Sequence, residues 1–349
     1  MRFVEIKELK EGMVAGQEIY IKRGRNTVLL ASKGKPLTSD LIDSLQDAKI
    51  TKMLTDDPRS QGIYPAYPFS TEVEHDLRLK FDQFISGIDP KKETKIPYDL
   101  RAQINAAVEQ ISCTGAHLLF DAPSPDSILR IHSIDVMILS VAIGKRRGFS
   151  PDKLNDIGLA ALFHDVGMIQ IDKEIVNKNS SLFSEEAEKI KEHVKIGWRI
   201  LRDNVKVSGD ICYVAYRHHE RWDGSGYPDG QMGEKVKDIA RIVAIGDYYS
   251  GPISEGMNST MYRRKDIIEE ILKGGAFDPE FVEIFEKIII PYPVCSIVRL
   301  NNGKEGIVME LNKDFFRPKI KVLDKQDESK DSVLDLSQHQ DIYIEECNI

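Results

Sequence analysis

The chain has 349 residues, long enough for two or three domains, and its 41% hydrophobic content can supply ordinary cores. Its net charge of −8 argues against a protein that coats DNA or RNA, so an anionic substrate must be held by local positive charge. No apolar run reaches the roughly 18 residues of a membrane span, and the first residues lack the apolar stretch of a signal peptide.

Residues 1–57 are predicted to form a small α+β module. Residues 19–21 and 27–31 have the composition of strands. A helix follows them, and either Thr38 or Ser39 can cap its first turn. No chemistry is visible in this module.

The middle of the chain is predicted to be helical. Residues 58–70, with three prolines and a glycine, form a linker. Helical periodicity at 71–86 and 98–120 indicates a connecting region that extends to residue 125. Residues 126–290 show a nearly all-helical pattern and form the next predicted domain.

Residues 291–349 are predicted to be rich in strands. Apolar residues at 295–300 and 306–311 flank Asn302-Gly303, which is a strong hairpin signal. The charged segment 324–331 is predicted to be a loop. The four cysteines show no Cys-x-x-Cys spacing and indicate reduced thiols in a cytoplasmic protein.

A metal-site constellation stands out in the helical region. The chain has 8 histidines, and five of them fall in four places, together with two aspartates. Neutral imidazole is the commonest metal-binding side chain. A catalytic site with two cations holds them about 3.5–4 Å apart and needs a carboxylate that bridges them, a role that suits Asp165. In chain order the residues are His132, His164-Asp165, His193, His218-His219 and Asp247.

Each of these residues also has a structural interpretation. A lone histidine on an amphipathic helix, such as His132 or His193, is more often structural than a ligand, and only its spacing to the other motifs favours ligation. Asp247 follows an apolar run and could be an ordinary helix cap. Residues 224–230 carry Ser-Gly and Tyr-Pro and could be only a tight turn.

The constellation resembles the HD superfamily of metal-dependent phosphohydrolases. The string from His218 to Pro228, His-His-Glu-Arg-Trp-Asp-Gly-Ser-Gly-Tyr-Pro, is similar to the HD-GYP branch, the cyclic di-GMP phosphodiesterases. The similarity runs from about Asp126 to about Glu286, under half of the chain. It implies an all-helical HD-type catalytic domain at 126–290 within a mainly α protein.

The resemblance also implies two divalent ions and the residues that bind them. It favours iron or manganese as the ions. One ion takes His132, His164, Asp165 and Asp247, and the other takes Asp165, His193, His218 and His219. His164 and Asp165 are the implied catalytic pair. The softness of the donor atoms alone would suit iron, manganese, zinc or nickel equally.

The chain departs from the family pattern in the residues that would meet substrate. The family usually reads His-Asp-hydrophobic-Gly-Lys, but Met168 stands in place of that lysine. Members with a third metal have a glutamate where this chain has Ile128, although Asp126 lies two residues earlier, so two ions are expected.

A second departure follows the last aspartate. The family usually reads Asp-x-Tyr/Phe-Asp-Ala-Leu-Thr and then a basic motif, whereas here Asp247 begins Asp-Tyr-Tyr-Ser-Gly-Pro and the basic residues come late. Arg263 or Arg264 is expected to bind substrate, with a solvated basic turn as an equal alternative. Tyr227 of the Gly-Tyr-Pro string is the third expected substrate contact.

Three functions are consistent with these features. The first is hydrolysis of cyclic di-GMP to pGpG or GMP by a metal-bridged hydroxide. The second is an inactive sensor or adaptor, and the third is hydrolysis of another cyclic dinucleotide such as cyclic GMP-AMP. The complete ligand set favours the enzyme. Protein partners at Gly226-Tyr227-Pro228 and a homodimer are further expectations, and no DNA partner is expected.

Overall fold

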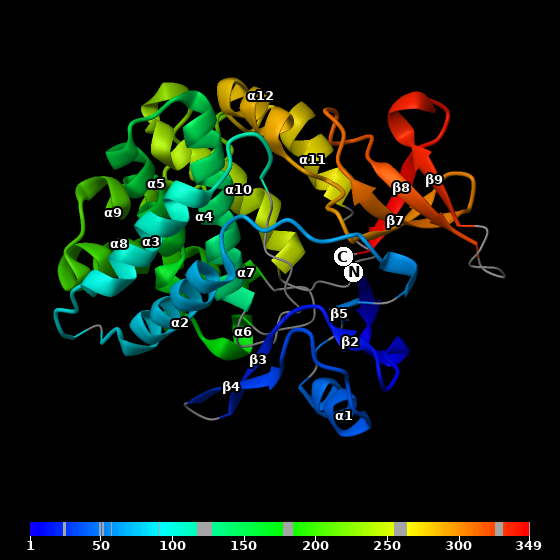
Figure 1. The fold of residues 1–349 in the computed structure, drawn as a ribbon. Helices are drawn as coiled ribbons and strands as arrows, with labels where there is room; N and C mark the ends of the chain where they lie inside the picture. Colours follow the sequence, from blue (N-terminus) through cyan, green and yellow to red (C-terminus); the bar gives the residue numbers. More distant parts are fainter. Residues whose placement is uncertain are drawn as a thin grey trace.

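A computed structural model gives the fold (Figure 1). It describes residues 1–23, 26–48, 50, 52–56, 58–89, 91–116, 128–176, 184–254, 264–324 and 331–348. A helical body occupies the middle of the chain, and strands from both ends of the chain flank it. The predicted mainly α class, with a small α+β module before the helices and strands after them, is confirmed. Within the described ranges, no helix combines the length and apolarity that a bilayer crossing requires.

The N-terminal module contains two small sheets and one helix. In the first sheet, β5 (Lys52–Asp56) lies between β1 (Arg2–Glu5) and β2 (Val14–Ala15). The second sheet is an antiparallel hairpin of β3 (Ile19–Arg23) and β4 (Asn26–Ala31). Helix α1 spans Ser39–Asp47, and Thr38 is its cap, because the Thr38 hydroxyl accepts a hydrogen bond from the Leu41 amide at 3.3 Å.

The helical body follows. Its helices are α2 (Thr71–Gly87), α3 (Tyr98–Gln110), α4 (Ile128–Arg147), α5 (Pro151–Phe163), α6 (Lys173–Val176), α7 (Ser184–Lys191), α8 (His193–Arg199), α9 (Gly209–Arg217), α10 (Asp238–Ser254), α11 (Arg264–Lys273) and α12 (Pro279–Ile288). Short turns of 3-10 helix, η3 (Val166–Gln170) and η5 (Gly233–Lys235), lie between them, and a π-helical segment, Ile200–Val205, continues α8.

Helix α4 is the centre of this body. The sequence predicted an amphipathic helix around His132, but residues 131–144 are buried on all sides. The reason is that α5 and α10 both pack along α4, and α12 contacts it as well. A helix that is apolar all round belongs in the interior. His132 therefore projects from the most buried helix of the body.

The predicted helix at 98–120 is too long. Helix α3 ends at Gln110, and Ile111 has an extended backbone. Two polar contacts stop the helix, because the Ser112 hydroxyl accepts from the Thr114 amide and also bonds the Thr114 hydroxyl. Such side-chain bonds compete with helical ones. Residues 117–120 lie outside the described part.

The C-terminal strands form one five-stranded antiparallel sheet in the order β10-β6-β7-β8-β9. The predicted hairpin at Asn302-Gly303 is present as β6 and β7. The Gly303 backbone has a φ of 78°, which glycine adopts without strain. The strands are β6 (Ile297–Leu300), β7 (Glu305–Glu310), β8 (Lys319–Leu323), β9 (Ser332–Asp335) and β10 (Ile344–Asn348).

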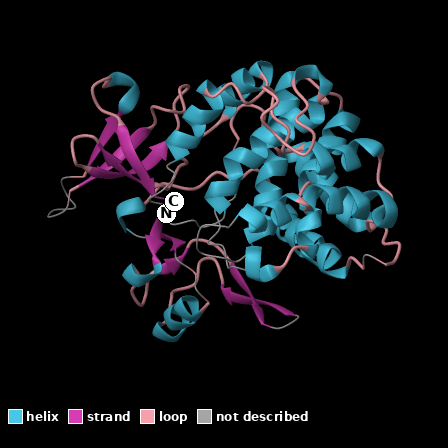
Figure 2. Ribbon diagram, turned by 180° about the vertical axis from the view of Figure 1, so that it is seen from behind, coloured by secondary structure: helices cyan, strands magenta, loops and turns pink. Residues whose placement is uncertain are grey.

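The two ends of the chain pack together. Figure 2 shows the strands of both ends on the same side of the helical body. Phe3 and Leu54 of the N-terminal sheet share a buried cluster with Ile63, Cys295 and Ile307, and the Phe3 amide donates to the Cys295 carbonyl at 3.3 Å. The C-terminal sheet is thus packed against the N-terminal module.

Candidate metal centre

Seven side chains from five parts of the helical body meet at one buried place. His132 comes from α4, and His164 and Asp165 follow α5 directly. His193 begins α8, His218 and His219 follow α9, and Asp247 lies within α10. Their ligand atoms fall into two groups, each with all atoms within 4.8 Å of one another. The first group is Asp165, His193, His218 and His219, and the second is His132, His164 and Asp247.

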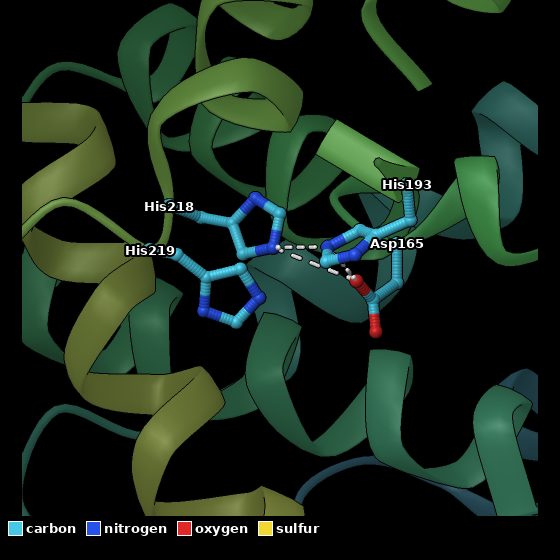
Figure 3. A group of neighbouring side chains, drawn as sticks. All are labelled: Asp165, His193, His218 and His219. Atoms are coloured by element: carbon cyan, nitrogen blue, oxygen red, sulfur yellow. Dashed lines mark hydrogen bonds and ion pairs between the residues drawn. The ribbon is translucent and has the colours of Figure 1, made fainter. Parts of the chain in front are cut away.

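Asp165 lies between the two groups. Its Oδ1 atom is 3.2 Å from His193 Nε2 and 3.5 Å from His218 Nε2. Its Oδ2 atom is 3.5 Å from His164 Nε2 and 4.0 Å from His132 Nε2. Figure 3 shows Asp165 directed toward His193 and His218. Each carboxylate oxygen therefore faces a different group of imidazoles, which is the arrangement of a bridging ligand.

Asp247 also faces histidines with both oxygens. Its Oδ1 atom is 3.2 Å from His132 Nε2 and 3.6 Å from His164 Nε2, and its Oδ2 atom is 3.5 Å from His219 Nδ1. The alternative that Asp247 caps a helix is wrong, because α10 begins nine residues earlier, at Asp238.

Two glycines allow the helices to approach closely enough for these contacts. A Cβ atom on Gly167 would lie 2.0 Å from the His193 carbonyl oxygen, so any side chain there would push α8 away from Asp165. A Cβ atom on Gly246 would lie 3.1 Å from Ser140 Oγ and 3.2 Å from the Val136 carbonyl oxygen of α4. Gly246 thus lets α10 pack closely on α4, which brings Asp247 to His132.

Hydrogen bonds to Nδ1 fix the orientation of four imidazoles. Three of them hold Nδ1 against a backbone carbonyl of the preceding turn, and the fourth holds it against a serine hydroxyl. In each case Nε2 is the nitrogen that faces the carboxylates, as second-shell bonds commonly arrange for metal ligands. The pairs are His164 with Ala161 (2.6 Å), His193 with Ile190 (2.7 Å), His218 with Val214 (3.1 Å) and His132 with Ser250 (3.1 Å).

The charge state of the centre suits cations. Burial alone would lower the pKa of His164, but the facing carboxylates of Asp165 and Asp247 raise it to about 9. Burial opposes ionisation of these two carboxyls, yet the surrounding histidines hold both of their pKa values well below the usual range. Burial lowers the pKa values of His218 and His219, so both are neutral. Ionised carboxylates and neutral imidazoles are the forms that bind metal, so an ion at this place would displace the proton that His164 holds.

Two buried atoms of the centre also lack hydrogen-bond partners. Within the described ranges, His164 Nε2 and Asp165 Oδ1 are buried and accept or donate no hydrogen bond. A polar group that is buried and unsatisfied costs free energy, and a divalent ion would satisfy both atoms. The residues present therefore fit two ions.

The Gly-Tyr-Pro loop covers one side of the centre. The Tyr227 ring stacks on His219, with ring centroids 4.6 Å apart and planes at 22°, and the Tyr227 amide donates to the His219 carbonyl. A Cβ atom on Gly226 would lie 2.3 Å from that carbonyl oxygen, so the loop can approach only with glycine there. Burial and the charges of Asp247 and Asp165 raise the pKa of the Tyr227 phenol, which stays protonated and able to donate.

Sequence reasoning missed two residues that support the centre. Glu220 is fully buried and accepts hydrogen bonds from Arg217 at 2.8 Å and from the amides of Asp229 and Gln231 at 3.0 Å. It therefore ties the end of the loop, at Asp229 and Gln231, back to the segment that follows α9. Ser250, which bonds His132, was visible only as a departure from the family motif. Glu220 follows the histidine pair directly, and this adjacency was the signal that could have identified it.

The expected substrate residues are only partly described. Arg263 lies outside the described residues, as do Asp126 and most of the departure after Asp247. Arg264 is the first residue of α11, but its side chain lies outside the described part. Met168 is half-buried in η3, three residues after Asp165. These substrate contacts, including that of Tyr227, stay predictions.

Comparisons with known proteins agree with this geometry. A family model described as HD domain matches residues 121–281. The cyclic di-GMP phosphodiesterase PA4108 of Pseudomonas aeruginosa is 32% identical over 199 residues, which are 56% of this chain and 48% of that protein. Residues 121–281 therefore match an HD domain. The matched region covers most of the predicted all-helical domain at 126–290 and contains the seven histidine and aspartate side chains of the centre.

Two further similarities were found for this chain. The 3'3'-cGAMP-specific phosphodiesterase 2 of Vibrio cholerae is 31% identical over 214 residues, which are 60% of this chain and 38% of that protein. The chain thus spans about half or less of the length of these two relatives. The structure of Bd1817, an HDG"Y"P protein from Bdellovibrio bacteriovorus, superposes with a TM-score of 0.53 and covers 81% of this chain and 97% of that one. At 16% identity, this likeness shows the fold alone.

Proposed function

We propose that this protein is a cyclic di-GMP phosphodiesterase that hydrolyses its substrate to pGpG or GMP. The observation that carries the proposal is the position of Asp165, whose two oxygens face two separate groups of imidazoles. Phosphodiester hydrolysis by two ions needs such a bridge. The relative from Pseudomonas aeruginosa, which bears this activity in its name, supports the choice of substrate.

Two divalent ions, iron or manganese, are proposed as the cofactors. His132, His164 and Asp247 would hold one ion, His193, His218 and His219 would hold the other, and Asp165 would contact both. When bound, the ions would lower the pKa of a water molecule and neutralise charge on the phosphoryl oxygens. The buried, unsatisfied atoms of His164 and Asp165 support this assignment.

The remaining groups of the site would bind and orient the substrate. The Tyr227 hydroxyl, protonated and beside His219, is proposed to donate a hydrogen bond to the substrate phosphate. Arg263 and Arg264 are proposed to supply positive charge, since Met168 cannot. The surface of Gly226-Tyr227-Pro228 is a proposed contact for protein partners, and a homodimer and a cytoplasmic location remain parts of the proposal.

The domain limits remain a proposal. They are 1–57 for the N-terminal module, 58–70 for the linker, 71–125 for the connecting region, 126–290 for the catalytic domain and 291–349 for the C-terminal segment. Arg59 of the linker bonds Asp331 of the C-terminal segment, so the linker is held in place at its start.

Two alternative functions follow from specific observations. The similarity to a 3'3'-cGAMP-specific enzyme favours cyclic GMP-AMP as the second substrate to test. The loss of the lysine at Met168 favours an adaptor that retains ions without turnover.

One experiment separates these functions. Protein purified without oxygen and loaded with Mn²⁺ or Fe²⁺ is incubated with cyclic di-GMP and, separately, with cyclic GMP-AMP, and the products are resolved by chromatography. Accumulation of pGpG or GMP from cyclic di-GMP supports the proposal. Preference for cyclic GMP-AMP would replace the substrate, and retention of two ions without hydrolysis of either nucleotide would favour the adaptor.

A further inference from the structure

His132 differs from the other oriented histidines in the partner of its Nδ1 atom. His164, His193 and His218 face backbone carbonyls, which only accept hydrogen bonds, so Nδ1 of each ring must carry a proton. His132 Nδ1 faces the Ser250 hydroxyl at 3.1 Å. A hydroxyl both donates and accepts, so this contact allows either tautomer of His132.

The other side of the His132 ring favours the tautomer that cannot bind a cation. His132 Nε2 lies 3.2 Å from Asp247 Oδ1, within hydrogen-bond distance of a carboxylate. In the ion-free protein, a proton on Nε2 is therefore donated to Asp247, and the Ser250 hydroxyl donates to the bare Nδ1. His132 and Ser250 are 6% and 1% exposed, so water offers neither group a good substitute partner.

We propose that Ser250 is a positioning residue that lets His132 exchange tautomers when an ion binds. Binding moves the proton from Nε2 to Nδ1, the Ser250 hydroxyl turns from donor to acceptor, and the number of protons on the ring stays the same. The ion of the group His132, His164 and Asp247 then binds only with this exchange, whereas Nδ1 of His164, His193 and His218 already holds a proton and needs none. The inference rests on the proposed two-ion centre, but it concerns how the chain loads its ions rather than what it hydrolyses.

The first test reads the tautomer directly. Protein labelled with ¹⁵N-histidine is studied by long-range ¹H–¹⁵N correlation spectra, first free of ions and then with Zn²⁺, which is diamagnetic. The His132 signals should show the proton on Nε2 without ions and on Nδ1 with zinc, while His164, His193 and His218 carry it on Nδ1 without ions. A His132 proton already on Nδ1 in the ion-free protein would overturn the proposal.

The second test measures ion affinity in matched variants. In Ser250→Ala the ion-bound form leaves a buried Nδ1–H without an acceptor, and loss of a second-shell partner typically costs 10- to 100-fold in metal affinity. One of two Zn²⁺ ions should therefore be lost about 10- to 100-fold more easily to a competing chelator, while the other is retained. Ser250→Asp supplies a carboxylate that only accepts, so it should keep the His132 proton on Nδ1 without ions and bind the same ion more tightly.

Ser140→Ala is the control. Ser140 is fully buried on α4 beside α10, and within the described ranges its hydroxyl bonds no other group. The variant removes an equally buried hydroxyl and should leave both affinities unchanged. Equal zinc affinity in wild type and Ser250→Ala would overturn the proposal, as would a Ser250→Asp variant that binds no tighter. If the wild type bound no zinc, the two-ion centre itself would be wrong, and the ion-free spectra would still decide the role of Ser250.

Discussion

At the scale of single residues, the centre depends on the carboxylate of Asp165. Its two oxygens lie 3.2 and 3.5 Å from histidines of opposite groups. We expect Asp165→Ala to bind fewer than two ions and to lose hydrolysis by at least about 100-fold, because both proposed ions lose a ligand. Elemental analysis and the nucleotide assay measure these losses, and far-ultraviolet circular dichroism checks that the helices remain. Asp152→Asn, at the exposed start of α5, is the control. Two ions per chain in Asp165→Ala would contradict the bridging role.

Met168 is the second residue whose chemistry decides function. One charge-assisted contact to a phosphate is worth about 1.5–3 kcal/mol, which is roughly 10- to 100-fold in affinity. If the protein is a weakened enzyme, Met168→Lys should lower KM for cyclic di-GMP by about that factor, with a smaller effect on kcat. Steady-state kinetics of both proteins measure the change. Met168→Gln, similar in length but uncharged, is the control, and an equal effect of lysine and glutamine would show that charge at this position is not limiting.

At the scale of elements, the Gly-Tyr-Pro loop is held by a buried carboxylate. Glu220 is fully buried, and it accepts from Arg217 and from two loop amides. Glu220→Ala leaves Arg217 short of a partner and both amides unsatisfied, and breaking a buried pair costs about 3–5 kcal/mol. We expect faster hydrogen exchange in residues 224–231 and weaker stacking of Tyr227 on His219, while exchange in α4 stays slow.

A loop residue without this anchoring role provides the comparison. Asp223 is exposed, and in the described part of the chain it bonds only the amide and hydroxyl of Ser225, within the same turn. Asp223→Ala should therefore leave exchange at 228–231 near that of the wild type. If the Asp223 and Glu220 variants loosened the loop equally, Glu220 would not be its anchor.

The sequence predicted those elements and residues that have a local signal. It did not predict features that depend on contacts between distant parts of the chain. The histidine and aspartate motifs predicted the seven side chains that meet, and the cap at Thr38 and the turn at Gly303 are local features. The end of α3 at Gln110 depends on bonds between Ser112 and Thr114, which compete with a helical pattern that continues in the sequence. The roles of Ser250 and Glu220 depend on partners that only the fold brings near.

At the scale of the whole molecule, the two ends of the chain form one packed unit beside the helical body. The N-terminal sheet shares a buried cluster with β7 of the C-terminal sheet. The C-terminal segment also contacts the helical body, since Phe315 lies close to Gly115 beyond α3. A change at one end of the chain therefore reaches the other end through direct contacts.

The main polar connection of this unit is the pair Arg59 and Asp331. Arg59 Nη2 lies 2.6 Å from Asp331 Oδ1 and donates to the Asp324 carbonyl at 2.8 Å, while its Nε donates to Asp331 Oδ2 at 3.3 Å. Their side chains are 20% and 7% exposed, so the pair is more protected than a surface ion pair. Residues in contact couple by about 0.5–3 kcal/mol.

The last prediction measures this coupling in a double-mutant cycle. Arg59→Ala, Asp331→Ala and the double variant are compared by the free energies of hydrogen exchange of amides in β5 and β7, and the coupling should fall in that range while exchange in α4 and α10 is unaffected. The exposed pair Glu5 and Lys7 is the control and should couple less.

The same pair makes the stability depend on pH. The hydrogen bond from Arg59 lowers the pKa of Asp331. The stabilisation by the ion pair is therefore present above the ordinary aspartate pKa and is lost as the pH falls through the lowered pKa of Asp331. Arg59→Ala should therefore make the stability of β5 and β7 less sensitive to acid, and an unchanged sensitivity would show that the pair does not join the two ends.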